Sequence, residues 1–289
     1  MANQTTQQKK GGAWRVVFAI SLVVLIASLV ALGVIAFSYF QGQMKYGEVA
    51  ENADFDPNDV NGELANVKVD WDALLKVNGD TVAWIYMPNT VINYPVVKGP
   101  DNDYYLTHDF DGDAGWLANY GSVFMDYRNN PDWTDQSYFF YGHHMNDGSM
   151  FSDVAGLTDQ ARFDECRTIF LLSPKGNFRL RTFAMLHVAA DDPLVQTGFA
   201  TEEEMTAYVQ DKMNRSVVEV KDAPKASDIK HTFALATCDN LYGDGRYILY
   251  AYIEDTTTEG LTGDLGIQGD GGEGSGFVND LAVKEGESS

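Results

Sequence analysis

The longest uncharged stretch of the chain limits what its first forty residues can fold into. It reads VVFAISLVVLIASLVALGVIAFSYF, from Val16 to Phe40, and has no charged side chain over 25 positions. A helix rising about 1.5 Å per residue would extend about 37 Å here, more than the roughly 30 Å hydrocarbon core of a bilayer. We therefore predict a transmembrane signal anchor over residues 16–40. A cleaved signal peptide is the alternative, because small residues such as Ala27 lie within the stretch, but its apolar part is usually only about 7 to 15 residues long.

The charges on the two sides of this stretch predict its orientation. Residues 1–15 carry Lys9, Lys10 and Arg15 and no acid, which leaves 17 of the 20 basic residues and all 42 acidic residues for the other side. Basic residues favour the cytoplasmic side of a membrane. We expect a cytoplasmic N-terminus at 1–15, a single membrane pass, and an extracellular location for the rest of the chain.

Composition excludes one large class of partners. The formal net charge is −22, whereas nucleic-acid binding needs a clustered basic surface. The chain is 45% apolar and 12% aromatic, which is typical of a globular protein with a core. No nucleotide-binding loop and no paired-cysteine or His-Glu-x-x-His metal motif is present, so we predict neither a cofactor nor a metal site.

The remaining chain divides by composition into three parts. Residues 41–62 are polar and acidic, as in a linker or a loose helical collar near the bilayer. Residues 63–254 are rich in β-branched and aromatic residues and form the predicted catalytic domain. Residues 255–289 are acidic and rich in glycine, so we expect a disordered tail.

The domain is predicted to be mainly β. One helix is expected at Thr201–Asn214, with a threonine N-cap and acids in its first turn. Many short strands with few helices favour a closed barrel or a sandwich over a doubly wound α/β sheet. The eight candidate strands read TVAWIYMP, VINYPVVKG, GSVFMDY, QSYFFYG, RTIFLLS, FRLRTFAMLHVAA, HTFALATC and RYILYAYIE.

Cys238, one of only two cysteines, ends the seventh candidate strand. Reactive groups often lie at strand ends, because the scaffold fixes them where substrate can enter. Arg246 begins the eighth strand after a turn with Gly243 and Gly245, so it could lie beside Cys238 and stabilise an oxyanion. A disulfide between Cys238 and Cys166 is the alternative, although Cys166 precedes an apolar run where a lone cysteine usually acts as a small apolar residue.

The histidine pair at 143 and 144 is the best source of a proton-transfer group. It follows the fourth candidate strand, again at a strand end. Neighbouring residues of a strand point to opposite faces, which lets one histidine face the site and disfavours chelation of one metal by both. Alternating acids at Asp109, Asp111 and Asp113 leave calcium binding open, but the later positions of an EF-hand are unmatched, and we interpret the loop as a solvated turn.

Three motifs together resemble those of a known family. YGHHMNDGSMF at 141–151, ALATC at 234–238 and the arginine eight residues later are similar to the histidine, cysteine and arginine motifs of sortases. WIYMPNTVINYPVVKGPDNDYYLTHDF and GSVFMDYRN resemble the early strands of class B sortases in particular. The resemblance covers roughly 69–254.

The resemblance implies a fold and an activity. Class B sortases have a closed eight-stranded β-barrel with N-terminal helices and a long helix before the cysteine strand. They are cysteine transpeptidases on the outer face of Gram-positive membranes. They cleave a C-terminal sorting motif of a surface protein, often NPQTN-like, through a thioester acyl-enzyme, and transfer the protein to an amine of a peptidoglycan precursor or of a pilin.

The resemblance also implies roles for individual residues. Cys238 is expected to be the nucleophile, His143 the general acid and base, and Arg246 the group that stabilises developing charge. The residues expected to bind substrate are Leu235, Thr237, His144 and Tyr242. Relatives usually have Thr at the position of Ala234 and often Ser at that of Ala236, which puts the substrate specificity in question.

Two other functions compete with this one. A cysteine peptidase would only hydrolyse its acyl-enzyme, and a non-enzymatic surface-binding barrel protein would leave Cys238 inert. The resting ionisation is also open: a thiol and an imidazole with reference pKa values of about 8.5 and 6.5 would both be in the forms needed for attack about 1% of the time near pH 7.5. Either the two groups form an ion pair or the enzyme works from a minority form.

Overall fold

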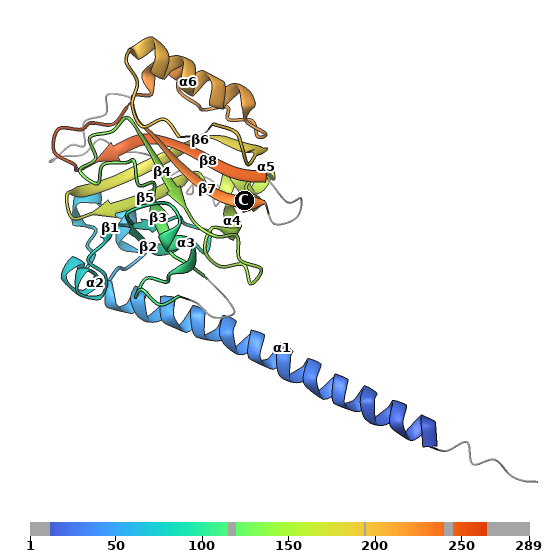
Figure 1. Cartoon of the computed structure of the whole chain (residues 1–289). Helices are drawn as coiled ribbons and strands as arrows, with labels where there is room; N and C mark the ends of the chain where they lie inside the picture. The colour runs from blue at the N-terminus through green and yellow to red at the C-terminus, as the bar shows by residue number, and fades with distance from the viewer. Residues whose placement is uncertain (1–11, 115–119, 194, 240–244, 265–289) are drawn as a thin grey trace, which may run out of the picture.

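The computed structural model describes residues 12–114, 120–193, 195–239 and 245–264. Its centre is a closed eight-stranded barrel with the strand order β1-β2-β3-β4-β7-β8-β6-β5 (Figure 1). Each of the eight predicted strands is present. Their bounds are β1 Thr81–Tyr86, β2 Asn93–Val97, β3 Val123–Met125, β4 Ser137–Tyr141, β5 Thr168–Ser173, β6 Gly176–Ala189, β7 Thr232–Asp239 and β8 Gly245–Thr256.

Neighbouring strands of the barrel are mostly antiparallel, but β2 pairs with β3 and β4 pairs with β7 in parallel. The parallel β4–β7 pair matters for function, because the carboxyl ends of parallel strands lie at the same edge of a sheet. β7 also pairs with β8 along its length in antiparallel register. The ends of β4 and β7 and the start of β8 therefore lie together at one edge of the barrel.

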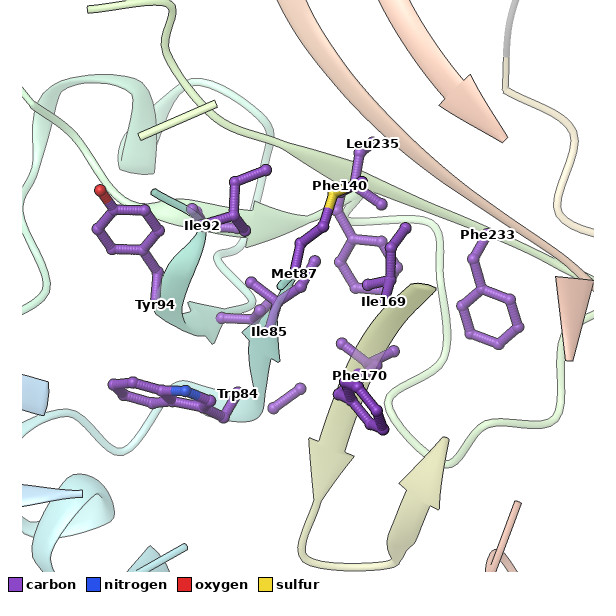
Figure 2. Packing of buried hydrophobic residues seen from close by; sticks show 14 of the residues in the cluster. Trp84, Ile85, Met87, Ile92, Tyr94, Phe140, Ile169, Phe170, Phe233 and Leu235 are labelled. Atoms are coloured by element: carbon purple, nitrogen blue, oxygen red, sulfur yellow. The ribbon is translucent and has the colours of Figure 1, made fainter. Parts of the chain in front are cut away.

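Alternation along the strands produces two separate cores. One fills the barrel, where side chains such as Ile85, Phe140 and Leu235 pack together (Figure 2), and continues on the other face of β1, where Trp84 packs against Phe55. The other lies outside the barrel wall, and Phe139, Ala234 and Tyr250 belong to it. Because side chains of a strand alternate between the two faces, Ala236 of β7 and Ile248 of β8 face outward as well.

Helix α6, Glu202–Arg215, covers the outer core on the opposite side of the barrel from α1 (Figure 1). Its buried Met205 and Val209 belong to the same core. The side chain of Thr201 accepts a hydrogen bond from the backbone N–H of Glu204, which caps the first turn. The helix predicted at Thr201–Asn214 is thus confirmed. The other helices are α2 Trp71–Val77, α3 Tyr104–Thr107, α4 Ser152–Gly156 and α5 Gln160–Glu165, with short 3-10 turns at Asp59–Asn61, Leu64–Asn66 and Ala226–Asp228.

Helix α1, Gly12–Asn52, is continuous from the apolar stretch to the barrel (Figure 1). It has a mean hydropathy of 2.9 over its most apolar window, none of which is buried, and is long enough to span a membrane. Of the two interpretations of 41–62, a linker or a helical collar, the helical one fits its first part, because α1 continues to Asn52. Tyr46, Val49 and Ala53 are buried against the barrel, so this polar segment has one apolar side.

The predicted boundary between the folded domain and the disordered tail, at residue 255, is too early in the chain. Strand β8 continues to Thr256, and Thr256 and Thr258 are buried. The carboxylate of Asp264 accepts hydrogen bonds from the backbone N–H groups of Ile253 and Lys230 and pairs with His231 at 3.1 Å. These contacts make 255–264 part of the folded domain. The rest of the predicted tail, 265–289, lies outside the described residues.

Candidate active site

The ladder between β7 and β8 places Cys238 directly opposite Arg246. Alternation along β8 assigns Arg246 to the outer face, in line with Ile248 on the same strand. The backbone adjacency expected from the sequence is therefore present. The guanidinium of Arg246 is half-buried, and its Nη1 donates to the carbonyl oxygen of Gly245 at 2.9 Å.

His143 follows the parallel neighbour of the cysteine strand. Tyr141 at the end of β4 pairs with Ala236, and the N–H of Gly142 donates to the Ala236 carbonyl oxygen at 3.3 Å. The hydroxyl of Thr237 donates to the carbonyl oxygen of Gly142 at 2.8 Å. His143 and Cys238 each follow the Tyr141–Ala236 pair by two positions, so both lie at the same end of the β4–β7 pair.

The imidazole of His143 is held by a backbone carbonyl. Its Nε2 lies 2.7 Å from the oxygen of Leu106. A carbonyl oxygen only accepts hydrogen bonds, so Nε2 must carry a proton, and in the neutral ring Nδ1 is the unprotonated nitrogen. The half-buried ring thus has one nitrogen engaged with the protein and the other available for proton transfer.

A short closed loop follows the histidine. The N–H of Phe151 donates to the carbonyl oxygen of His143 at 2.9 Å, and His144 forms an isolated β-bridge with Met150. The ring of Phe151 packs on Gly142, where an added Cβ would lie 2.7 Å from the ring. His144 is half-exposed beside His143. The loop fixes the backbone of both histidines.

The other three histidines make structural contacts with neighbouring side chains. His108 stacks on Tyr104 with ring centroids 4.0 Å apart, and His187 stacks on Tyr247 at 4.4 Å. His231 pairs with Asp264 at the opposite end of β7 from Cys238. His187 opposes Tyr247, one position from Arg246, so it also lies toward this edge, but the pair at 143 and 144 is the one that follows β4, the parallel neighbour of β7.

The residues predicted to bind substrate fall in different environments. Leu235 is fully buried in the barrel interior, and Thr237 is 2% exposed with its hydroxyl bonded to Gly142. Both side chains are therefore buried within the protein and make structural contacts, and neither is exposed at the surface of β7. Tyr242 lies outside the described residues. Ala234 and Ala236 are buried in the outer core, so a hydroxyl there would meet protein rather than solvent.

Cys166 is buried with a free thiol, and its Sγ lies 3.8 Å from the carbonyl oxygen of Asn89. A disulfide from it to Cys238 is therefore not formed. Burial raises the pKa of the Cys166 thiol. This cysteine behaves as the small apolar residue that the sequence indicated.

The acidic loop after His108 holds a lysine instead of lying free in solvent. Lys45 of α1 places its Nζ 3.2, 2.7 and 3.3 Å from carboxylate oxygens of Asp109, Asp111 and Asp113. Asp109 is only 7% exposed. The interpretation of this loop as a solvated turn holds for the exposed residues 111–114, but Asp109 is buried and the loop also contacts α1 through Lys45. In the described part of the chain no group of His, Cys, Asp and Glu side chains could hold a metal ion.

Two residues beside His143, Leu106 and Gly121, carry little sign of their role in the sequence itself. Leu106 supplies the carbonyl for His143, and its side chain carries no signal of that role. Gly121 has a positive φ of +53°, and an added Cβ would lie 3.1 Å from Cδ2 of His143. The motif GSVF was identified only as the start of a strand.

Comparison with known proteins agrees with this arrangement. No protein-family model matches the chain. Sortase B of Listeria monocytogenes is 31% identical over 236 residues, which cover 77% of this chain and 93% of that protein. The chain belongs to the sortase family, class B. Sortase B of Staphylococcus aureus is 27% identical over 184 residues, 62% of this sortase and 71% of that one.

Solved structures agree in fold. The crystal structure of sortase B from B. anthracis in complex with AAEK1 superposes with a TM-score of 0.64 at 27% identity, covering 75% of this chain and 98% of that one. A Staphylococcus aureus sortase B–substrate complex gives a TM-score of 0.65 at 24% identity over the same shares. This sortase is thus a cysteine transpeptidase with the barrel of its class.

Proposed function

We propose that this sortase cleaves a sorting motif of a surface protein with Cys238 as nucleophile, His143 as general acid and base, and Arg246 as the charge-stabilising group. The observation that carries the proposal is the common edge formed by β4, β7 and β8. There Cys238 opposes Arg246, and His143 follows the strand parallel to β7. The cysteine, histidine and arginine motifs therefore converge in space although 95 residues separate His143 from Cys238.

The first half-reaction forms an acyl-enzyme. The thiolate of Cys238 attacks the carbonyl carbon of the scissile amide, and the oxyanion that develops accepts hydrogen bonds from the Arg246 guanidinium. The carbon–nitrogen bond then breaks, and the His143 imidazolium gives its proton to the departing amine. Because Nε2 is engaged with Leu106, Nδ1 is the atom that delivers this proton. The product is a thioester on Cys238 and a neutral imidazole.

The second half-reaction transfers the acyl group to an amine. Neutral His143 accepts a proton from the incoming amine through Nδ1 as the amine nitrogen attacks the thioester carbon. The carbon–sulfur bond breaks and the Cys238 thiolate leaves. A new amide results, and the imidazolium is restored for the next cycle.

The substrate and the acceptor are assigned by class. A solved relative is a sortase B–substrate complex, which supports a peptide substrate for this chain too. Its acceptor would be an amine of a peptidoglycan precursor or of a pilin. Neither a nucleic acid nor a cofactor is needed.

The proposed location is the outer face of the cell membrane. Helix α1 is long and apolar enough to span a bilayer, and basic residues precede it while acids dominate the barrel. A membrane-held enzyme meets substrates that are themselves held in the membrane during export, which raises their effective concentration. Catalysis in cells should therefore depend on the anchor more than catalysis in solution does.

An acceptor titration tests the transpeptidase assignment against hydrolysis. The full chain in detergent micelles is incubated with a peptide containing NPQTN and increasing triglycine, an α-amine, or Nα-acetyl-lysine amide, an ε-amine. A transpeptidase gives a ligated peptide in proportion to one of the amines. If both amines leave the free-acid product unchanged and no ligation occurs, the enzyme is a peptidase under these conditions and the transfer step is wrong.

A further inference from the structure

Helix α1 contacts the backbone segment that holds the catalytic histidine. Its Tyr46 is 7% exposed, and the tyrosine hydroxyl donates a hydrogen bond to the carbonyl oxygen of Gly121. The Tyr46 ring is fixed by an edge-on contact with Tyr94, with ring centroids 5.5 Å apart. Tyr46 lies beyond the apolar stretch of α1, on the part that packs against the barrel.

Gly121 in turn lies against both partners of the His143 hydrogen bond. A Cβ at Gly121 would be 2.9 Å from the carbonyl oxygen of Leu106 and 3.1 Å from Cδ2 of His143. The Leu106 oxygen is the acceptor for Nε2 of His143. The N–H of the following Ser122 donates to the Tyr105 carbonyl at 2.9 Å, which joins the two backbone segments. A shift of Gly121 would therefore move the group that orients the imidazole.

A second contact from α1 reaches the loop after the histidine. Asp147 in this loop accepts hydrogen bonds from the Tyr120 hydroxyl and from Gln43 Nε2 of α1, the latter at 3.1 Å. The Tyr120 hydroxyl is also 3.0 Å from the carbonyl oxygen of Tyr39. Tyr120 packs so closely on the helix that a Cβ at Gly42 would lie 2.2 Å from its ring. Both sides of His143, the Leu106 segment and the loop to Phe151, are thus connected to α1.

We propose that residues 39–52 of α1 act as a positioning element for His143, with Tyr46 as the positioning residue that holds Gly121 against the imidazole and its carbonyl partner. The inference rests on the proposed role of His143. The part of the chain that enters the membrane then also sets the orientation of the general acid and base. Undocking of α1 would leave the barrel folded but the imidazole free to turn.

The first test removes one hydroxyl. Tyr46→Phe keeps the buried ring and loses the bond to Gly121. Tyr39→Phe is the matched control on the same helix, because Tyr39 contacts Tyr120 through its ring and backbone oxygen. With the full chain in micelles and the NPQTN peptide, Tyr46→Phe should lower kcat about tenfold and leave KM unchanged, since misplacing a catalytic group impairs the transition state more than substrate binding.

A spectroscopic measurement reports the orientation itself. In chains labelled with ¹⁵N-histidine, the resonances of His143 are identified by their loss in His143→Asn. In the wild type, at a pH where the ring is neutral, the proton should be on Nε2. Tyr46→Phe should show a mixture of the two tautomers, whereas Tyr39→Phe should not. A hydroxyl with a merely structural role would lower the melting temperature without changing the tautomer.

A second pair of variants tests the docking of α1 at a different contact, the one with Tyr120. Gly42→Ala places a methyl group against the Tyr120 ring, whereas Gly47→Ala on the same helix meets nothing within 4 Å. Both changes raise helix propensity equally. Gly42→Ala should lower kcat and mix the tautomers, and Gly47→Ala should behave as the wild type.

The two proposals fail in different ways. If the wild type turns over the peptide but Tyr46→Phe and Gly42→Ala match their controls in kcat and tautomer, the positioning role is wrong and the proposed function stands. If His143→Asn turns over the peptide as fast as the wild type, the assignment of His143 as acid and base is wrong. The tautomer measurement then still decides whether α1 orients the ring.

Discussion

Cys238 and Arg246 are direct cross-strand partners at the turn end of the β7–β8 hairpin. The alternation that buries Leu249 and Ala251 inside the barrel assigns position 246 to the outer face with Ile248 and Tyr250. The proposed nucleophile and the guanidinium therefore come from adjacent strands of the barrel. Such a site needs little reorganisation when charge develops on the substrate.

Replacement of Arg246 tests the role of this cross-strand pair. Arg246→Ala should lower kcat/KM for the NPQTN peptide by about 100-fold, as expected for loss of an oxyanion donor. Arg246→Lys keeps the charge but loses the planar fork, so we expect a fall of about tenfold. Arg179→Ala is the control, because Arg179 pairs with Glu254 and Asp255 at the other end of the barrel. Equal activity of Arg246→Ala and the control would contradict the assignment.

Thr237 joins the histidine strand to the cysteine strand. Thr237→Val leaves the buried Gly142 carbonyl without this donor, which should reduce the free energy of unfolding by about 1–2 kcal/mol and also lower kcat. Thr237→Ser keeps the hydroxyl and should retain most activity. Thr232→Val removes the hydroxyl bond to Ser137 at the far end of the same strand pair, so it should lower stability with kcat unchanged. Kinetics and urea unfolding of the three variants separate these outcomes.

Asp126 should make the barrel sensitive to acid. Burial raises the pKa of this carboxyl, but hydrogen bonds from Arg128, Asn102 and Tyr141 outweigh burial and lower it. A carboxyl with a depressed pKa contributes stability above its unfolded value of about 3.9, and the contribution is lost as pH falls through the folded value. Asp126→Asn should thus lower the midpoint of urea unfolding at pH 7. Near pH 3 the midpoints of the variant and the wild type should differ less. A constant difference at both pH values would contradict this explanation.

Truncation at two positions should separate the effect of membrane anchoring from the effect of docking α1 on the barrel. A chain starting at Gln41 lacks the apolar stretch but keeps Lys45, Tyr46 and Val49, and it should cleave peptide in solution at nearly the full rate. In cells it should anchor less surface protein at equal abundance, because substrate and enzyme no longer share the membrane. A chain starting at Asp54 loses the docked segment and should also be slower in solution. Equal rates for the two truncated chains would show that docking is dispensable for catalysis.

The sequence predicted the barrel well because each strand carries its own signal. β-branched and aromatic runs bounded by turn residues mark all eight strands, and Thr201 with three following acids marks α6. The Cys238 and Arg246 positions follow from a short hairpin, in which register is local. The histidine pair was selected from its position at a strand end, but the choice of His143 within it required the resemblance to sortases. Nothing in the sequence alone predicts that β4 pairs with β7 in parallel.

The predicted start and end of the folded domain were wrong, because average composition does not reveal tertiary contacts. The segment 41–62 is polar on average, yet Tyr46, Val49 and Ala53 recur at helical spacing, a signal that a test for periodicity would detect. The segment 255–264 contains glycine and acids, but Asp264 is held by backbone N–H groups from β8 and from the residue before His231. Contacts of this kind depend on the assembled barrel and leave no local pattern.

The central claim is that Cys238 carries the acyl group. The most direct measurement is the intact mass of the full chain after brief mixing with a panel of NPQTN-like peptides, with Cys238→Ala as the control. We predict a mass increase equal to the N-terminal fragment of one peptide on the wild type alone. An adduct of the same mass on Cys238→Ala, or no adduct from any peptide together with a thiol at Cys238 that resists alkylation, would contradict the proposed mechanism.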